Sequence, residues 1–143
     1  MNVSRILAAK PETVVTISPG SELKKALEIL AEYDIGALVV TNERDEVVGI
    51  LSERDIVRCA NRVDDVITMP VFDVMTKNVI VGLPEDDLMS VAHTMTERRF
   101  RHLPIVDGRR LIGIVSIGDV LKAQRDAYSC LLYTSPSPRD PRG

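Results

Sequence analysis

The sequence contains one block twice, and this duplication limits the folds that the chain can adopt. Residues 49–55 read Gly-Ile-Leu-Ser-Glu-Arg-Asp and residues 113–119 read Gly-Ile-Val-Ser-Ile-Gly-Asp, an offset of 64 positions (113 − 49). Each block leads from an apolar stretch into Ser-x-x-Asp and then into an amphipathic segment. This pattern is typical of a strand that is followed by the N-terminus of a helix. The chain is therefore predicted to contain two similar units.

The Ser-x-x-Asp motif has two interpretations that do not exclude each other. In the first, Ser52 and Ser116 are helix N-caps, and Asp55 and Asp119 accept from the cap N–H groups, as in a capping box. In the second, the unpaired N–H groups and the positive dipole end of each helix face a bound anion. The serine hydroxyl then contacts a phosphate and the aspartate accepts from a sugar diol. One isolated copy favours the cap, whereas two copies at matching positions favour ligand binding.

The composition argues against several classes of protein. The 143 residues are 45% hydrophobic, and no apolar run approaches the about 20 residues that span a bilayer. With no signal-peptide pattern at the N-terminus, the prediction is a soluble cytoplasmic protein without a membrane partner. The net charge of −3 and the 3% aromatic content argue against a nucleic-acid partner. Cys59 and Cys130 lie in unrelated contexts, so both are predicted to be reduced thiols.

The first unit is predicted to span residues 1–62. A short helix over residues 1–9 precedes a β-branched strand at 14–17, and Ser18-Pro19 resembles the N-cap and first position of a helix. That helix has a stripe of apolar side chains at helical spacing, namely Leu23, Ala26, Leu27 and Leu30. A buried strand at 35–40, a polar turn at 42–46 and a strand at 47–51 follow, which indicates a hairpin.

The second unit is predicted to span residues 70–125, after a polar linker at 63–69. Its apolar pattern repeats that of the first unit, with a strand at 79–81, a helix from Pro84, and strands at 100–106 and 111–115. Leu83 stands where the first unit has Ser18, so the second helix is predicted to lack this cap. Because about 60 residues bury little surface alone, the two units are expected to share one core.

The last segment, residues 126–143, differs from the rest of the chain. It has no apolar period, and three of the eight prolines lie in its last eight residues. We predict that this segment is disordered and is not native to the chain.

With its paired units, the chain resembles a tandem pair of CBS domains, in particular the small stand-alone bacterial proteins. Each unit combines an apolar-x-Pro helix start, a strand (Ile-Gly-Ala-Leu-Val-Val or Arg-His-Leu-Pro-Ile-Val) and a closing Gly-Ile-x-Ser-x-x-Asp. The resemblance covers about residues 3–124. It implies an α/β (α+β) fold of two β-α-β-β-α repeats that pack as a pseudo-two-fold pair.

The resemblance also implies a function. CBS pairs are usually non-catalytic regulatory modules that bind AMP, ADP, ATP, NAD(H) or S-adenosylmethionine in clefts between the repeats, and they commonly form disc-like homodimers that act on an effector protein. Carried onto matching positions, Asp55 and Asp119 accept from ribose hydroxyls, and Ser52 and Ser116 approach the phosphate. The adenine slots are implied at Gly36, Ala37, Arg101, His102, Thr13, Val14, Asn78 and Val79. Gly118 replaces the possible phosphate partner Arg54 in the second site.

Other candidate sites have simpler explanations. Within the basic run at residues 98–102, a solvated helix end accounts for Arg98 and Arg99, whereas Arg101 and His102 favour an anion-facing role. His93 is interpreted as a surface residue, and no His or Cys pair has zinc-ligand spacing. No catalytic triad or phosphate-binding loop is present in the sequence. The alternatives that stay open are a structural interaction module with empty clefts and a weak nucleotide hydrolase.

Overall fold

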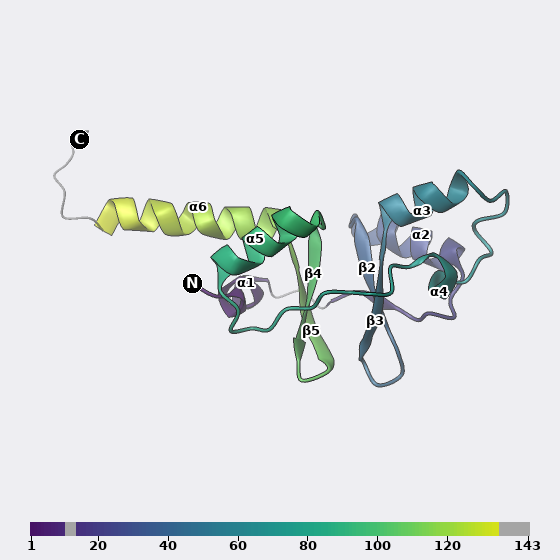
Figure 1. The fold of residues 1–143 in the computed structure, drawn as a ribbon, viewed down its shortest axis with the longest axis horizontal. Coiled ribbons are helices and arrows are strands. Elements are labelled where there is room, and N and C mark those ends of the chain that lie inside the picture. The colour runs from purple at the N-terminus through teal and green to yellow at the C-terminus, as the bar shows by residue number, and fades with distance from the viewer. Residues whose placement is uncertain (11–13, 135–143) are drawn as a thin grey trace.

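The computed structural model describes residues 1–10 and 14–134, and these residues form a mixed α/β fold with two similar halves (Figure 1). The elements in chain order are α1 (Val3–Ala9), β1 (Thr16–Ile17), α2 (Leu23–Tyr33), β2 (Ala37–Thr41), β3 (Val47–Ser52), α3 (Glu53–Ala60), α4 (Val71–Val74), α5 (Leu88–Arg98), β4 (His102–Asp107), β5 (Arg110–Ser116) and α6 (Ile117–Thr134). The predicted fold class is confirmed.

Each half is built on an antiparallel hairpin, β2-β3 in one and β4-β5 in the other. In the first half β1 adds a parallel strand to β2, with Ile17 opposite Val40. Within the described residues, the second half has a single parallel bridge at the corresponding place, between Gly82 and Ile105. Gly82 lies 65 positions after Ile17 (82 − 17), and Ile105 lies 65 positions after Val40 (105 − 40). The two hairpins lie side by side with the helices on their outer sides (Figure 1).

The apolar stripe of α2 packs onto β2 and β3 and forms the first core. Leu23, Ala26 and Leu30 are buried, together with strand residues such as Leu38 and Leu51. All five residues of β2 are buried, which is why this strand is almost continuously apolar. Burial of these side chains is the main favourable contribution to folding of this half.

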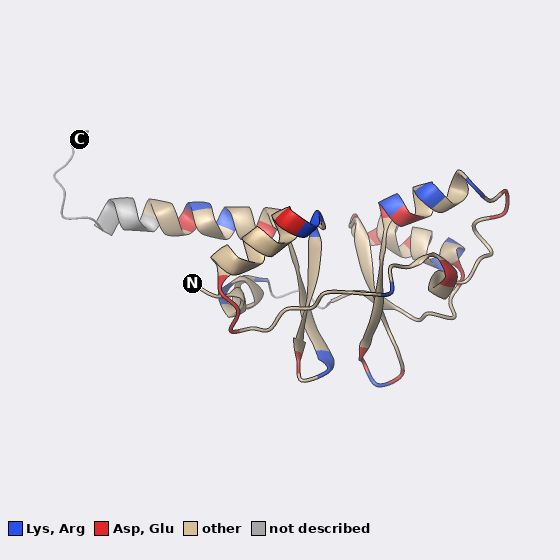
Figure 2. Ribbon diagram, in the orientation of Figure 1, with Lys and Arg blue, Asp and Glu red and all other residues tan. Residues whose placement is uncertain are grey.

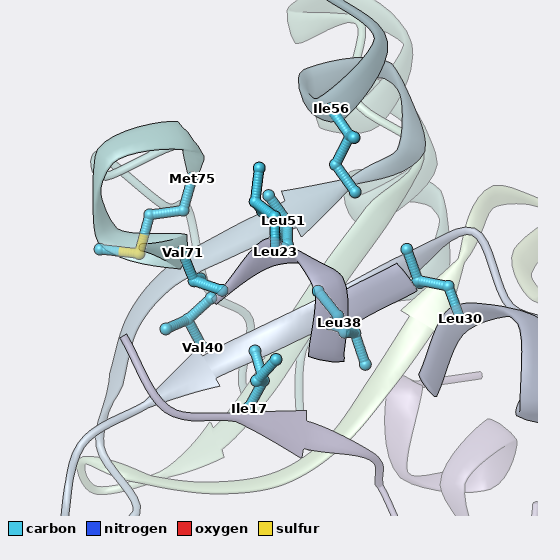
Figure 3. Packing of buried hydrophobic residues seen from close by; sticks show 10 residues of the cluster. Ile17, Leu23, Leu30, Leu38, Val40, Leu51, Ile56, Val71 and Met75 are labelled. Carbon is cyan, nitrogen blue, oxygen red and sulfur yellow. The ribbon is translucent and has the colours of Figure 1, made fainter. Parts of the chain in front are cut away.

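The short helices α1 and α4 are exchanged between the halves. Val3 and Ile6 of α1 belong to the second core, while Val71 of α4 and the adjacent Met75 belong to the first. Figure 3 shows Val71 of α4 and the adjacent Met75 beside the strands of the first half. Each core therefore includes a short helix that precedes the other half's helices and strands in the sequence, which ties the halves into one unit.

The long helix of the first unit was predicted to start at Ser18-Pro19, and this prediction is wrong. Residues 18–21 form a turn, and α2 begins at Leu23 after the N-cap Glu22. The linker backbone replaces a side-chain cap, because Leu23 N–H donates to the carbonyl of Met69 (2.9 Å) and Lys24 N–H to that of Ile67 (2.9 Å). These N–H groups therefore need no serine.

The helix of the second half was predicted to start at Pro84 without a cap, but it starts later and Asp87 caps it. The α5 helix starts at Leu88, and the Asp87 carboxylate accepts from the N–H groups of Met89 (3.0 Å) and Ser90 (3.2 Å). The predicted strand at 79–81 is also wrong, because within the described residues only the neighbouring Gly82 bridges to β4.

The helix at the end of the chain is longer than the repeat pattern predicted. Residues 126–134 were predicted to be disordered, but they continue α6 to Thr134. Good helix formers such as Ala127 permit this, and the helix ends just before Pro136, whose ring restricts the preceding residue. Residues 135–143 lie outside the described part of the chain. Across the described residues no helix, α6 included, combines the length and apolar character needed to cross a membrane.

Candidate ligand clefts between the two repeats

Both Ser-x-x-Asp motifs form capping boxes, so the first interpretation of the motif is confirmed. Ser52 Oγ accepts from Asp55 N–H (3.2 Å), and Asp55 Oδ2 accepts from Ser52 N–H (3.0 Å). Ser116 and Asp119 repeat this arrangement at 3.1 and 2.9 Å. Among the described residues neither Oδ1 atom accepts a hydrogen bond, so each aspartate keeps one oxygen for another donor.

A backbone hydrogen bond places each of these helix starts beside the start of a strand. Glu53 N–H donates to the Gly36 carbonyl at 3.0 Å, and Ile117 N–H donates to the Arg101 carbonyl at 2.9 Å. The residues on either side of these bonds therefore lie at the same end of each hairpin. This geometry brings Gly36 and Arg101, and with them Ala37 and His102, close to the Ser-x-x-Asp motifs.

The first cleft, of about 480 Å³, combines residues of both repeats. Seven of the predicted site residues line it, namely Gly36, Ala37, Ser52, Arg54, Asp55, Arg101 and His102. Arg58, Arg99 and Thr76 also line it and were not predicted. Arg58 lies four positions after Arg54 on α3, so helical spacing alone places both on one face. Arg99 is the C-cap of α5 in the left-handed region (φ 60°), which no sequence pattern indicated.

The first cleft is rich in positive charge. Four arginines line it, Arg54, Arg58, Arg99 and Arg101, against two carboxylates, Glu53 and Asp55. Figure 2 shows basic segments along α3 and where α5 meets β4. Within the described residues none of the four guanidinium groups forms a salt bridge. Their donors are therefore free to bind an anion.

The second cleft, of about 300 Å³, is smaller and mostly apolar. Five predicted site residues line it, namely Val14, Gly36, Ala37, His102 and Ser116. Its walls are completed by aliphatic side chains, including Leu7, Ile35, Ile112 and Ile114. Gly36, Ala37 and His102 line both clefts, so the two sites share one wall.

Lys10 is a residue of the second cleft that the sequence did not indicate. Its Nζ donates to Asp119 Oδ2 at 2.8 Å and to the Ile114 carbonyl at 3.2 Å. Burial disfavours the charged Asp119 carboxylate, but the hydrogen bonds from Lys10 and Ser116 outweigh it and lower the pKa of Asp119 below its usual 3.8. Lys10 also lines an adjoining groove of about 430 Å³ between α1 and α6, and Asp119 lines this groove and not the second cleft itself.

Four predicted site residues line neither cleft. Asp119 lines the groove between α1 and α6 instead, Thr13 lies outside the described residues, and Asn78 and Val79 are absent from both linings. Thr76 lines the first cleft instead, because its backbone pairs with Ile50 of β3 through two hydrogen bonds (3.0 and 2.9 Å). The register of this bridge determines which residue of the segment reaches the cleft.

His102 lies in the shared wall, and its surroundings favour the neutral imidazole. Burial is the largest cause and the nearby Arg101 the next, and Lys10 adds to them. The carboxylates of Asp119 and Glu53 oppose the shift but do not cancel it, so the pKa of His102 falls below its usual 6.5. The ring is therefore predominantly uncharged at neutral pH.

This shift predicts a pH dependence of stability. The pKa of His102 is lower in the folded chain than in the unfolded chain, so the unfolded chain binds more protons. The stability associated with a neutral His102 is therefore complete above about pH 6.5 and is lost as the pH falls through the folded pKa. We expect urea unfolding of the wild type to lose stability between pH 7 and 5 more steeply than His102→Gln, by at most about 1.4 kcal/mol per pH unit. Parallel profiles would contradict the shift.

Together, the exchanged helices, the paired hairpins and the two clefts at their junction define a tandem-repeat α/β module. Comparisons with known proteins identify its class. The sequence matches the CBS domain over residues 7–62 and again over 71–126. The chain therefore belongs to the CBS-domain family, as a tandem pair of CBS domains.

Solved structures of other CBS pairs are similar to this chain. The CBS-domain containing protein ATU1752 from Agrobacterium tumefaciens is 37% identical, with a TM-score of 0.82 over 87% of this chain and 99% of that one. The CBS pair of MJ0100, solved with 5-methylthioadenosine and S-adenosyl-L-methionine, is 25% identical (TM-score 0.78; 89% of this chain and 98% of that one). CBSX2, solved with AMP, is 26% identical (TM-score 0.75; 87% and 97%).

Some curated relatives are longer than this chain. A 33.4 kDa protein in the ribosomal RNA operon of Thermofilum pendens is 42% identical over 101 residues, which are 71% of this chain. The chain spans 33% of the length of that relative.

Proposed function

We propose that this CBS pair is a regulatory module that binds adenosine-containing ligands in its two clefts and carries out no catalysis itself. One observation carries the proposal. The first cleft joins Ser52 and Asp55 of one repeat to Arg101 and His102 of the other. A single ligand in this cleft therefore contacts both repeats, so its binding energy depends on how they are arranged.

Each group in the cleft matches a part of such a ligand. The free Oδ1 of Asp55 accepts from a ribose hydroxyl, since Oδ2 is occupied by the Ser52 N–H. The start of α3 and the unpaired Arg54 and Arg101 attract phosphate, because guanidinium groups donate to it bidentately. The wall at Gly36 and Ala37 has little side-chain bulk, which leaves room for a planar base.

The relatives support the same class of ligand. CBSX2 was solved with AMP, and the MJ0100 pair with 5-methylthioadenosine and S-adenosyl-L-methionine. These molecules share an adenosine moiety and differ in what is attached to the ribose. The proposal for this chain is therefore the adenosine class, with AMP, ADP, ATP, NAD(H) and S-adenosylmethionine as candidates.

Regulation requires that the ligand distinguish two arrangements of the module. We propose that a cytoplasmic homodimer transmits this difference to an effector protein. Exposed apolar side chains at matched positions support a dimer, since Val57 of α3 is 67% exposed and Leu121 of α6 is 58% exposed, 64 positions apart (121 − 57). Their equivalent positions on the last helix of each repeat are what a contact shared by both repeats with another chain would use.

The test is a thermal-shift panel of these ligands on the full chain, followed by titration. A ligand at 100 times its Kd adds about 2.7 kcal/mol of stability. We expect Asp55→Ala to weaken binding in the first cleft by about 1.5–3 kcal/mol, and Asp119→Ala, in the groove beside the second cleft, to weaken binding there by a similar amount. Asp55→Asn and Asp119→Asn serve as controls for the fold, because the amide oxygen still accepts from the cap N–H.

Two outcomes decide against the proposal. Unchanged affinities in both alanine variants and in the double variant would show that the clefts are not the site. A folded protein that responds to no ligand would favour the structural interaction module, and product formation lost in Asp55→Ala would favour the hydrolase. Sedimentation of the same samples tests the dimer, which a monomer mass would contradict.

A further inference from the structure

The two clefts share a wall but differ in charge. Beyond the common Gly36, Ala37 and His102, the first cleft has four arginines and two carboxylates. The only other charged side chain among the described residues that line the second cleft is Lys10. The pseudo-symmetry of the fold therefore does not extend to the electrostatics of the sites.

The aspartates of the two capping boxes also differ. Within the described residues Asp55 has no salt-bridge partner, whereas Asp119 is paired with Lys10 at 2.8 Å. The side chains of this pair are only 35% (Lys10) and 27% (Asp119) exposed, so solvent screens it less than a surface pair. Lys10 also donates to the Ile114 carbonyl, which holds it in place. The positive charge of the second cleft is thus already neutralised.

The first cleft favours the binding of an anion, and the second cleft disfavours it. In the first cleft, the guanidinium groups of Arg54 and Arg101 form no salt bridge within the described residues. They can donate hydrogen bonds to a phosphate in place of the water that it loses on binding. In the second, a phosphate would lie against aliphatic side chains such as Leu7 and Ile112, and it would have to break the Lys10–Asp119 pair to gain a cation. Burial of an unpaired charge in such surroundings is costly.

We propose that the clefts take different ligands, a phosphorylated adenosine ligand in the first and an adenosine ligand without phosphate in the second. This inference rests on the proposed function and adds the ligand class of each cleft. The smaller volume of the second cleft, about 300 Å³ against about 480 Å³, agrees with the smaller ligand. Asp119 lines the groove beside this cleft, next to Lys10, which lines both, and its Oδ1 is left for a ribose hydroxyl at this edge of the cleft while Oδ2 accepts from Lys10.

The experiment is isothermal titration of the full chain with ADP and, separately, with adenosine. For ADP we expect a loss of about tenfold or more in affinity in Asp55→Ala and in Arg101→Gln, because each removes a hydrogen-bonded charge. Asp119→Ala should leave the ADP affinity within about twofold and weaken adenosine by about tenfold. Salt should weaken ADP binding and leave adenosine binding unchanged.

Two variants serve as controls. Arg109→Gln removes a positive charge from the 89% exposed side chain of a hairpin turn, and it lines neither cleft, so both affinities should stay within about twofold. Lys10→Met tests the opposite assignment, in which Lys10 leaves Asp119 to bind a phosphate. We expect this variant to keep its ADP affinity.

The outcomes separate this inference from the proposed function. After saturation with adenosine, ADP should still bind, at a separate site. Competition between the two ligands for one cleft, or ADP binding that depends on Asp119 and Lys10 and not on Asp55 and Arg101, would overturn the division of ligands while the proposed function stands. Binding of neither ligand would overturn both.

Discussion

Leu51→Ala is expected to lower the free energy of unfolding by about 2–5 kcal/mol, the range for a buried leucine whose cavity only partly collapses. Leu51 is fully buried in β3, where it packs with Leu38 and with Val71 of the exchanged helix α4 (Figure 3). Urea unfolding monitored by circular dichroism measures the loss. The affected core supports the chain directly before Ser52, so the first cleft should lose its order as this half unfolds.

A matched control is Leu27→Ala on α2. Leu27 is 38% exposed and lies outside the buried core, so the same deletion should cost less than about 1 kcal/mol. Equal losses in the two variants would contradict the assignment of Leu51 to the centre of the core. Because α4 contributes Val71 to the same core, Val71→Ala should also destabilise the first half, although its sequence position is in the second repeat.

The sequence predicted the features that local patterns determine. The stripe from Leu23 to Leu30 has the period of a helix, and the alternation of turns and apolar runs reveals both hairpins. The capping boxes were also predictable, because Ser52 and Asp55 are three residues apart and act within one turn. Seven residues proposed for the site do lie together in the first cleft. They come from both repeats, and it was the resemblance to CBS pairs, not a local pattern, that assigned them to ligand sites between the repeats.

The features that were missed depend on contacts between distant segments. The start of α2 is capped by the carbonyls of Ile67 and Met69, so no residue near Ser18 indicates it. Lys10 meets Asp119 across 109 positions, only because α1 packs on the second half. Residues 79–81 are of the types that favour a strand, but within the described residues only the neighbouring Gly82 bridges to β4. Propensity gave no information on these pairings.

The shared wall has a consequence for signalling. Gly36, Ala37 and His102 line both clefts, so a ligand in one cleft changes the surroundings of the other. Coupling of this kind is reciprocal, because each ligand must alter the affinity of the other by the same factor. The ring of His102 is the largest side chain in this wall, and the backbone beside it is tied to α6 through the Arg101 carbonyl.

Gly36→Phe is expected to abolish binding in both clefts while the fold persists. A β-carbon at Gly36 would lie 3.1 Å from Glu53 Oε1, the end of a flexible side chain, and 4.0 Å from His102 Cε1. Gly36 has no positive φ, so an L side chain adopts its backbone conformation without strain. We therefore expect the free energy of unfolding to change by less than about 1 kcal/mol.

The phenylalanine ring has to lie in the space that the ligands need, because Gly36 lines both clefts. We expect the affinities for ADP and for adenosine to fall by at least about 100-fold, which is about 2.7 kcal/mol. Gly20→Phe is the control, because Gly20 lines neither cleft. A β-carbon at this position would meet only Ser18 Oγ, at 3.9 Å. Titration of both variants with ADP and with adenosine measures these affinities. Retained binding in Gly36→Phe would mean that the ligands bind away from the shared wall.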